Sequence, residues 1–321
     1  MKTQIAKAPR PLTPDEELSL IRKSLKHFTT EKPVKYWLDT GSELLNEVLG
    51  SREQGLPYGK IFEVAGFESQ GKTALLLKLA GMAQKDGAKI GWMDLEDSWD
   101  PDWARALGLN PEEVYLFRPR IVEAEEPKAD KPGKKKKKEE DRLQTAQEMM
   151  AELEEWMKLM RRKHPGGRLF AAVDSIAAML TEEEAAAGIQ DQNMRTMVSL
   201  AHFLSKLLRR WVAAMPNYNC MLFFANQLRV APGVSFGNPE YTVGGNAVRL
   251  YAAVRTRMRK KNKKVLKGGK AVGIKGTITN WKNKAGAGSR EGFICGYKLY
   301  YHGKIKYVDA DDIKSEGQET T

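Results

Sequence analysis

Apolar residues along this chain fall into two alternating patterns, short continuous runs and longer runs at helical spacing. The continuous runs predict buried β-strands at residues 61–65, 89–96, 169–174 and 221–225. The spaced runs predict helices that include residues 74–80, 146–160 and 194–211. Because strands that alternate with helices usually form a parallel sheet covered on both faces, we expect an α/β fold with a mostly parallel, twisted sheet flanked by helices.

A further short helix is predicted near the N-terminus. Thr13 suits the N-cap, Pro14 suits the first helical position, and Glu16 completes a capping box. So short a helix needs a surface to dock on, which can be its own core or a neighbouring subunit. We therefore divide the chain into three regions: a helical appendage with its linker at 1–35, a core at 36–310 and a short acidic tail at 311–321.

The loop after the first strand carries the clearest chemical pattern. It fits G-x-x-x-x-G-K-[ST] with Gly66, Phe67, Glu68, Ser69, Gln70, Gly71, Lys72 and Thr73. Glycine at both ends lets backbone N–H groups approach phosphate oxygens, and the helix N-terminus adds partial positive charge. Lys72 is then suited to the β- and γ-phosphates, and the Thr73 hydroxyl to Mg²⁺. A glycine-rich surface turn is the alternative, but the strand and helix on either side favour nucleotide binding.

The chain is basic, with 321 residues, a formal net charge of +12 and a pI near 9.4. This excess favours a polyanionic partner, because lysines and arginines that neutralise phosphates release counterions. Part of it is a lysine run at 134–138, inside a charged segment at 123–141 that we expect to be a solvated, disordered insertion. With no apolar stretch long enough for a bilayer and no secretory signal, we expect a cytoplasmic protein without membrane contact.

Three polar residues lie at the carboxyl ends of predicted strands, where the ligands of parallel sheets bind. Asp174 ends an apolar run and can orient Mg²⁺ beside Thr73, although an acid at a strand end is often only a turn residue. Glu96 can orient and deprotonate an attacking water, or can equally cap a helix. Gln227 comes directly after a strand with Asn226, and the pair can either sense a γ-phosphate or act as caps.

A segment rich in glycine and proline follows at residues 229–246. It is flanked by Arg229, Arg249, Arg255, Arg257 and Arg259. We interpret it as a mobile loop beside a basic surface. If such a loop is coupled to Gln227, the nucleotide that is bound would change the affinity of the loop for nucleic acid, and nucleic acid would change the affinity for nucleotide.

These motifs, in this order, resemble the RecA family of recombinases. The resemblance rests on residues 66–73, 94–101, 173–180, 224–229, 236–240 and 244–247, and on the later pair Lys282 and Lys284. It covers roughly residues 36–300, and Phe-Gly-Asn-Pro-Glu followed by Gly-Gly-Asn is its most specific part. It implies a RecA-type P-loop NTPase core that binds ATP and Mg²⁺ and hydrolyses ATP in response to DNA.

The resemblance also implies a role for each matching residue around the nucleotide. Glu96 matches the catalytic glutamate, Gln227 the γ-phosphate sensor, and Lys72, Thr73 and Asp174 the phosphate and Mg²⁺ residues. Asp100 and Trp103 fall where the family contacts adenine, although a tyrosine is more usual than Trp103. Lys282 and Lys284 match lysines that reach the ATP of the neighbouring subunit, like an arginine finger given in trans. Without the resemblance, these two lysines fit a solvated strand face.

Two DNA-binding loops are implied in the same way. The residues they would contribute are Met194, Arg195, Arg229, Val234, Phe236, Gly237, Asn238, Gly244, Gly245 and Asn246. Three features depart from the family: Pro232 stands where an aliphatic residue is common, the insertion at 123–141 has no counterpart, and few residues follow the core where a C-terminal domain is usual. The capture of duplex DNA by such a domain therefore does not carry over.

The function implied is an ATP-dependent DNA recombinase in recombination and repair. It would form helical filaments on single-stranded DNA and pair that strand with homologous double-stranded DNA, with single-strand-binding or mediator proteins as further partners. A hexameric helicase motor with the same core is one alternative, although it normally has an arginine finger in place of the two lysines. A non-catalytic filament or loader protein is another, and the intact set of nucleotide residues argues against it.

Overall fold

The computed structural model describes residues 10, 12–24, 34–123, 141–187, 194–233, 237, 239–285 and 291–315. Residues 1–35 and 36–321 form two compact units, which are described separately. The charged insertion, apart from its two end residues, lies outside the described residues, as do Val234, Phe236 and Asn238. Within the described residues, no helix is both long and apolar enough to span a bilayer.

The first unit contains helix α1 (Pro14–Ser24). Its capping box is the one that the sequence predicts. The backbone N–H of Thr13 donates to Glu16 Oε2 at 2.9 Å, and the N–H of Glu16 donates to Thr13 Oγ1 at 3.3 Å. Two backbone donors at the helix start are thereby satisfied.

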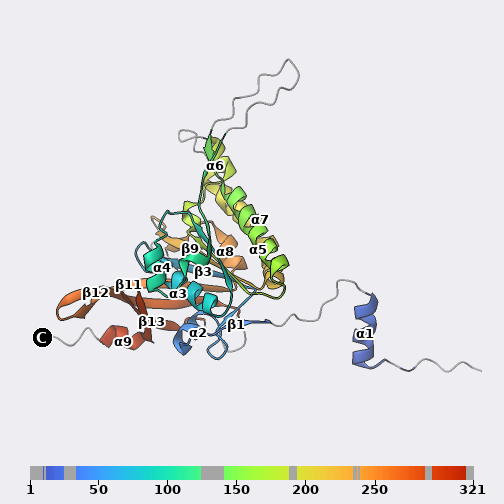
Figure 1. The fold of residues 1–321 in the computed structure, drawn as a ribbon, viewed down its shortest axis with the longest axis horizontal. Helices are drawn as coiled ribbons and strands as arrows, with labels where there is room; N and C mark the ends of the chain where they lie inside the picture. The colour runs from blue at the N-terminus through green and yellow to red at the C-terminus, as the bar shows by residue number, and fades with distance from the viewer. Residues whose placement is uncertain are drawn as a thin grey trace, which may run out of the picture. The chain divides into compact units, whose positions relative to one another are not determined.

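The second unit is built on one large twisted sheet. Its main strands, in spatial order, are β14 (Lys304–Asp309), β13 (Ile294–Tyr300), β12 (Lys270–Asn283), β11 (Val254–Lys267), β3 (Ile61–Gly66), β9 (Cys220–Val230), β8 (Leu169–Asp174), β4 (Lys89–Asp94) and β5 (Val114–Phe117). All pairs from β11 to β5 are parallel, and the pairs from β11 to β14 are antiparallel. Figure 1 shows the long β11–β12 hairpin on one side of this sheet. The mixed α/β sheet confirms the predicted fold class.

Helices cover both faces of the sheet because successive residues of each strand point to opposite sides. In β3, Phe62 packs into one core with α2 (Glu43–Leu49) and α3 (Lys72–Lys85), while Ile61 packs into the other. The second core contains the apolar faces of α5 (Ala146–Lys163), α7 (Met194–Tyr218) and α8 (Asn246–Tyr251). Figure 1 shows α5 and α7 side by side. The remaining elements are β1 (Trp37–Leu38), β2 (Leu56–Pro57), α4 (Pro101–Ala106), η1 (Pro111–Glu113), β6 (Ile121–Val122), β7 (Arg142–Leu143), η2 (Ile176–Ala178), α6 (Glu182–Ala187), β10 (Glu240–Thr242) and α9 (Ala310–Ser315).

One predicted strand end is wrong. The sequence places Asn226 and Gln227 after a strand that ends at residue 225, but β9 continues to Val230. The reason is non-local: β10 pairs antiparallel with Leu228–Val230 and carries the strand beyond its parallel neighbours. Gln227 is nevertheless the last residue of β9 to pair with β3, opposite Gly66. It therefore lies at the carboxyl edge of the parallel part of the sheet.

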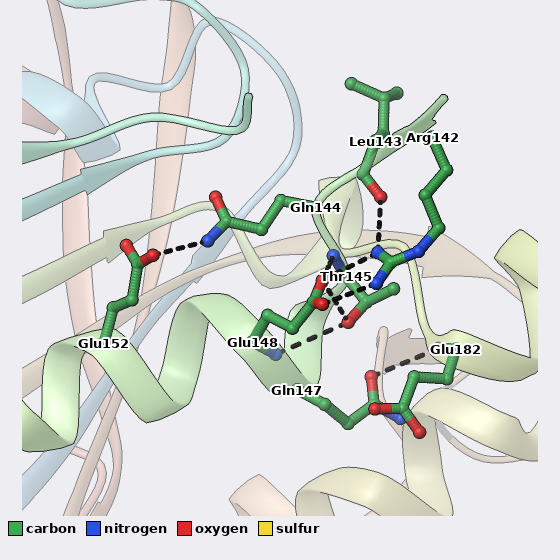
Figure 2. Close-up of polar contacts among 8 residues, drawn as sticks. All are labelled: Arg142, Leu143, Gln144, Thr145, Gln147, Glu148, Glu152 and Glu182. Carbon is green, nitrogen blue, oxygen red and sulfur yellow. Dashed lines mark hydrogen bonds and ion pairs between the residues drawn. The ribbon is translucent and has the colours of Figure 1, made fainter. Parts of the chain in front are cut away.

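The start of α5 is held by a dense set of polar contacts (Figure 2). Thr145 and Glu148 form a capping box, in which the N–H of Thr145 donates to Glu148 Oε2 at 2.8 Å. The guanidinium of Arg142 donates to both carboxylate oxygens of Glu148, at 2.6 and 2.8 Å. These contacts hold the pKa of Glu148 at about 2, with the Arg142 hydrogen bond as the largest cause. This helix start is therefore fixed by a fully paired carboxylate.

Candidate functional site: a nucleotide cavity beside a glycine-rich surface

The loop at residues 66–71 links β3 to α3 and takes backbone conformations that its glycines allow. Gly71, the N-cap of α3, has φ +87°, and a Cβ there would lie 3.2 Å from Leu299 Cδ2. A Cβ on Gly66 would lie 3.0 Å from the carbonyl oxygen of Met258. Gly71 thus favours glycine because of its backbone angle, and Gly66 because of the close approach of the Met258 carbonyl.

Two strands on the β11 side of β3 contact this loop. Tyr297 Oη, from β13, donates to the carbonyl oxygen of Gln70 at 2.7 Å. The backbone N–H of Lys260, from β11, donates to Gln70 Oε1. These two contacts hold Gln70 in place, and a loop of fixed shape is the condition for preorganised binding of phosphate.

Lys72 and Thr73 begin α3 and point their polar groups towards the loop and the strand ends. Lys72 Nζ donates to the carbonyl oxygens of Gly66 and Phe67 at 3.0 and 2.8 Å. Burial lowers the pKa of Lys72, and the nearby carboxylates of Asp174 and Glu96 oppose this shift. A partly buried ammonium group on a flexible stem is well suited to pair with phosphate.

Asp174 ends β8 and faces the start of α3. Thr73 Oγ1 donates to Asp174 Oδ2 at 2.7 Å, across 101 residues of sequence. Burial raises the pKa of Asp174 to about 6, although the Thr73 hydrogen bond lowers it. A hydroxyl and a carboxylate side by side are hard oxygen donors of the kind that Mg²⁺ takes, together with phosphate oxygens and water.

Glu96 lies beyond the end of β4 and receives two hydrogen bonds. Gln227 Nε2 donates to Glu96 Oε1 at 3.2 Å, and Ser175 Oγ donates to the same oxygen. The helix-cap alternative for Glu96 is not what the structure shows, because these partners are side chains from β9 and from the residue after β8. Sequence reasoning gave Ser175 no role, although its position directly after Asp174 was a usable signal.

These side chains line a single cavity of about 300 Å³. Its walls are Glu68, Ser69, Gln70, Gly71, Lys72, Thr73, Ala74, Glu96, Trp103, Asp174, Gln227, Ile274 and Leu299. Ile274 and Leu299, from β12 and β13, were missed by sequence reasoning because nothing in their local sequence marks them. Trp103 lies in the wall, but Asp100 is the N-cap of α4, where its Oδ1 accepts from the N–H groups of Asp102 and Trp103.

Lys282 and Lys284, the two lysines expected to reach the ATP of a neighbouring subunit, are not among the residues that line this cavity. Lys282 Nζ donates to the carbonyl oxygens of Arg249 and Leu250, at the end of α8, at 2.9 Å each. Lys284 is exposed, and its backbone N–H donates to the carbonyl of Ala253. Burial lowers the pKa of Lys282, and the positive charge of Lys284 lowers it further. The structure therefore does not bring either lysine into its own chain's nucleotide cavity.

A second cavity, of about 560 Å³, lies beside the glycine-rich segment. Arg229, Gly244 and Gly245 line it together with residues of α6 and α7. Gly244 has φ +87°, and a Cβ there would lie 2.5 Å from Leu204 Cδ1, so this close packing on α7 requires glycine. Met194 and Arg195 are the first residues of α7, Asn246 is the first of α8, and Gly237 has φ +86°. Val234, Phe236 and Asn238 lie outside the described residues.

Comparison with known proteins decides the family. The RecA N-terminal domain matches residues 22–127 and 164–301, which is most of the chain. The chain belongs to the RecA family. Over 223 residues, this RecA-family chain is 34% identical to "Protein RecA" of Treponema denticola, which covers 70% of the chain and 45% of that relative. It thus spans less than half the length of the curated relative that it matches.

The matched segments of this RecA-family chain include most of the nucleotide cavity. They take in the phosphate loop, Glu96, Asp174 and Gln227, and they also contain Ile274 and Leu299. Residues 128–163 fall between the two segments and include β7 and α5. The contacts around Arg142 and Glu148 therefore lie in a part of the chain that the family match does not cover (Figure 2).

Proposed function

We propose that this chain is a DNA-dependent ATPase that acts as a recombinase. The single observation that carries the proposal is that one cavity gathers the complete chemistry of phosphoryl transfer to water. A lysine, a hydroxyl beside a carboxylate, a second carboxylate and an amide all line it, in Lys72, Thr73, Asp174, Glu96 and Gln227. Membership of the RecA family supports the assignment.

The residues present fit ATP with Mg²⁺. Among the described residues no group of three or more His, Cys, Asp or Glu is placed to hold a metal ion, so a metal here needs phosphate oxygens to complete its ligands. That is the usual situation for Mg²⁺, which is held by one or two protein oxygens, phosphates and water. Thr73 and Asp174 would hold the ion, which would neutralise charge on the phosphates.

The other residues would bind and position the reacting groups. Lys72 would exchange its two carbonyl acceptors for phosphate oxygens. Ser175 and Gln227 would hold the Glu96 carboxylate in position, and Glu96 would accept a proton from the attacking water. Trp103, Ile274 and Leu299 would form the apolar wall against the base, and Asp100 would contribute only through its cap on α4.

Gln227 would connect hydrolysis to DNA. Its backbone carbonyl accepts from the N–H of Val243 at 3.4 Å, and Gly244 and Gly245 follow directly. A γ-phosphate that moves the Gln227 side chain would therefore shift the start of the glycine-rich surface, where single-stranded DNA would bind. Met194, Arg195, Arg229, Val234, Phe236, Gly237, Asn238 and Asn246 belong to the same proposed surface.

Self-assembly would complete the site. Lys282 and Lys284 would reach the ATP of a neighbouring subunit in a helical filament on single-stranded DNA, and the filament would pair with homologous duplex. Residues 1–35 would form the docking appendage of that filament. Lys282→Ala should therefore reduce ATP hydrolysis by the assembled protein and leave the nucleotide affinity of the unassembled chain unchanged. A helicase ring would instead appear as closed particles by electron microscopy with ATP and DNA.

ATP hydrolysis measured with and without single-stranded DNA tests the proposal. We expect DNA to stimulate hydrolysis by the wild-type chain, and Lys72→Ala to abolish it in both conditions. Hydrolysis that is equally fast without DNA would contradict the proposed coupling, and no hydrolysis under any condition would contradict the enzymatic assignment.

A further inference from the structure

The loop that carries Glu96 is folded around one buried carboxylate. Asp94 is the last residue of β4 and is completely buried. Its Oδ1 accepts from the backbone N–H of Ser98 at 2.9 Å and from the Ser98 hydroxyl at 3.3 Å. Its Oδ2 accepts from the backbone N–H of Trp99 at 3.1 Å. The residue before the loop is thereby bonded to the far end of the loop, with Glu96 between them.

The start of this loop is also tied to β8, the strand that ends in Asp174. Asp94 lies opposite Asp174 in the parallel pairing of β4 with β8. The backbone N–H of Leu95 donates to the carbonyl oxygen of Asp174 at 2.8 Å. The Glu96 carboxylate accepts from Ser175, which directly follows Asp174. Both the backbone before Glu96 and the Glu96 carboxylate are therefore held against the end of β8.

The middle of the loop depends on these bonds for its shape. Asp97 has φ +51°, in the left-handed region that is unfavourable for a residue with a Cβ. Glu96, Asp97 and Ser98 are all exposed, so burial in the core does not fix them. The hydrogen bonds from Ser98 and Trp99 to Asp94 offset the unfavourable backbone angle and keep the loop in one conformation.

A guanidinium group supplies the positive charge that a buried carboxylate needs. Arg118 directly follows β5, the strand that pairs with β4. Its Nε lies 3.3 Å from Asp94 Oδ2, and its Nη2 lies 3.7 Å from Asp97 Oδ1. One cation thus lies between the buried carboxylate and the residue that follows Glu96.

We propose that Asp94 is a positioning residue for ATP hydrolysis, which acts by holding Glu96 at the attacking water. The inference rests on the proposed function, and it adds a residue to which sequence analysis gave no role of its own. Asp94 is not among the residues that line the nucleotide cavity, so its effect on the reaction passes through Glu96. A general base must lie within hydrogen-bond reach of the proton that it accepts, and a displacement of about 1 Å can cost about 100-fold in rate.

Steady-state hydrolysis by an Asp94→Asn variant of the full chain tests the inference. The amide keeps the size of the side chain, but its NH₂ group cannot accept from the N–H groups of Ser98 and Trp99. We expect kcat for ATP, measured with single-stranded DNA, to fall about 10- to 100-fold. KM for ATP should stay near wild type, because the phosphate loop keeps its own contacts with Tyr297 and Lys260. Wild-type kcat in Asp94→Asn would overturn the proposal.

Asp86→Asn is the matched control for a purely structural effect. Asp86 precedes the other end of β4 and is also a paired carboxylate, with Tyr58 and Arg168 as its partners. Both variants should have a lower Tm, so hydrolysis is measured well below the Tm of each. Asp86→Asn should keep the wild-type kcat, because it leaves the loop around Glu96 unchanged. Equal losses of kcat in the two variants would show that Asp94 only supports the fold, and would contradict the proposal.

A double variant shows whether Asp94 acts through Glu96. A residue that acts only through Glu96 loses its effect once Glu96 has been replaced. Asp94→Asn should therefore cause no further loss in single-turnover hydrolysis when it is combined with Glu96→Gln. A further loss of about 10- to 100-fold in the double variant would mean that Asp94 acts independently of Glu96, and would contradict the proposal. No hydrolysis by the wild-type chain under any condition would instead contradict the proposed function.

Discussion

The carboxylates of the nucleotide cavity and of the start of α5 differ in the direction in which the fold shifts their pKa: the pKa of Asp174 is raised and that of Glu148 is lowered. At the start of α5, Glu148 is matched by a guanidinium and by its own helix cap, and its pKa is held at about 2 (Figure 2). In the nucleotide cavity, burial raises the pKa of Asp174 to about 6, and Thr73 supplies only a hydroxyl. A carboxylate that serves folding is paired within the chain, whereas one kept unfavourably buried in a cavity is suited to a ligand from outside.

The largest expected effect separates catalysis from folding at Glu96. Glu96→Gln should lower kcat for ATP about 10²- to 10⁴-fold, because the amide cannot accept a proton from water. It should leave nucleotide affinity and unfolding free energy near wild type, since the amide can still accept from Gln227 and Ser175. Steady-state hydrolysis measures kcat, and urea unfolding measures the free energy of unfolding. A Glu96→Gln variant that is destabilised but has normal kcat would show that Glu96 serves folding and not catalysis.

The next largest effect concerns Glu63, a buried carboxylate of β3 that is paired with Arg255 of the neighbouring strand β11. Glu63→Ala should destabilise the fold by about 3–5 kcal/mol, because it leaves the guanidinium of Arg255 buried without its ion-pair partner. The double variant Glu63→Leu with Arg255→Met removes both charges and should recover most of that loss. Urea unfolding checks both. A single variant as stable as the double would mean that the buried pair does not matter for folding.

Substitution of Asp174 should change the stability of the fold in the opposite direction to substitution of Glu63. With metal chelated at pH 7, Asp174→Asn should stabilise the fold by about 1–3 kcal/mol, because it removes a buried charge. Since the folded pKa is raised, the wild-type fold binds this proton more tightly than the unfolded chain, and stability falls as pH rises from about 4 to about 6. The advantage of Asp174→Asn should therefore shrink below pH 5 in urea unfolding at several pH values. A destabilised variant at pH 7 would contradict this.

The smallest effect is expected at Glu148. Because its folded pKa is lowered from 4.5 to about 2, its contribution is fully present above about pH 4.5 and is lost as pH falls towards 2. The difference in Tm between wild type and Glu148→Gln should therefore narrow over that window. Glu155→Gln, whose exposed pairs with Lys158 and Arg162 contribute little, should differ from wild type at no pH. A constant Glu148 difference down to pH 3 would contradict the assignment.

Local patterns were enough to predict the alternating strands and helices and the phosphate loop, because each lies in one continuous segment. The pairing of Asp174 with Thr73 was also predictable, since the carboxyl ends of parallel strands meet at one edge. Features that depend on the pairing of strands distant in the sequence could not be predicted from local patterns. β9 extends through its partner β10, and Ile274 reaches the nucleotide cavity from an antiparallel strand.

We propose that Gln227 couples ATP binding in the nucleotide cavity to DNA binding at the glycine-rich surface, so that both ligands shift one conformational equilibrium. Linkage tests it directly: single-stranded DNA affinity is measured with and without a hydrolysis-resistant ATP analogue, and analogue affinity with and without DNA. The two ratios must be equal if both ligands shift one conformational equilibrium. We predict that the analogue tightens DNA binding and that DNA tightens analogue binding by the same factor, which Gln227→Ala reduces towards one. Affinities that do not depend on each other in the wild-type chain would contradict the claim.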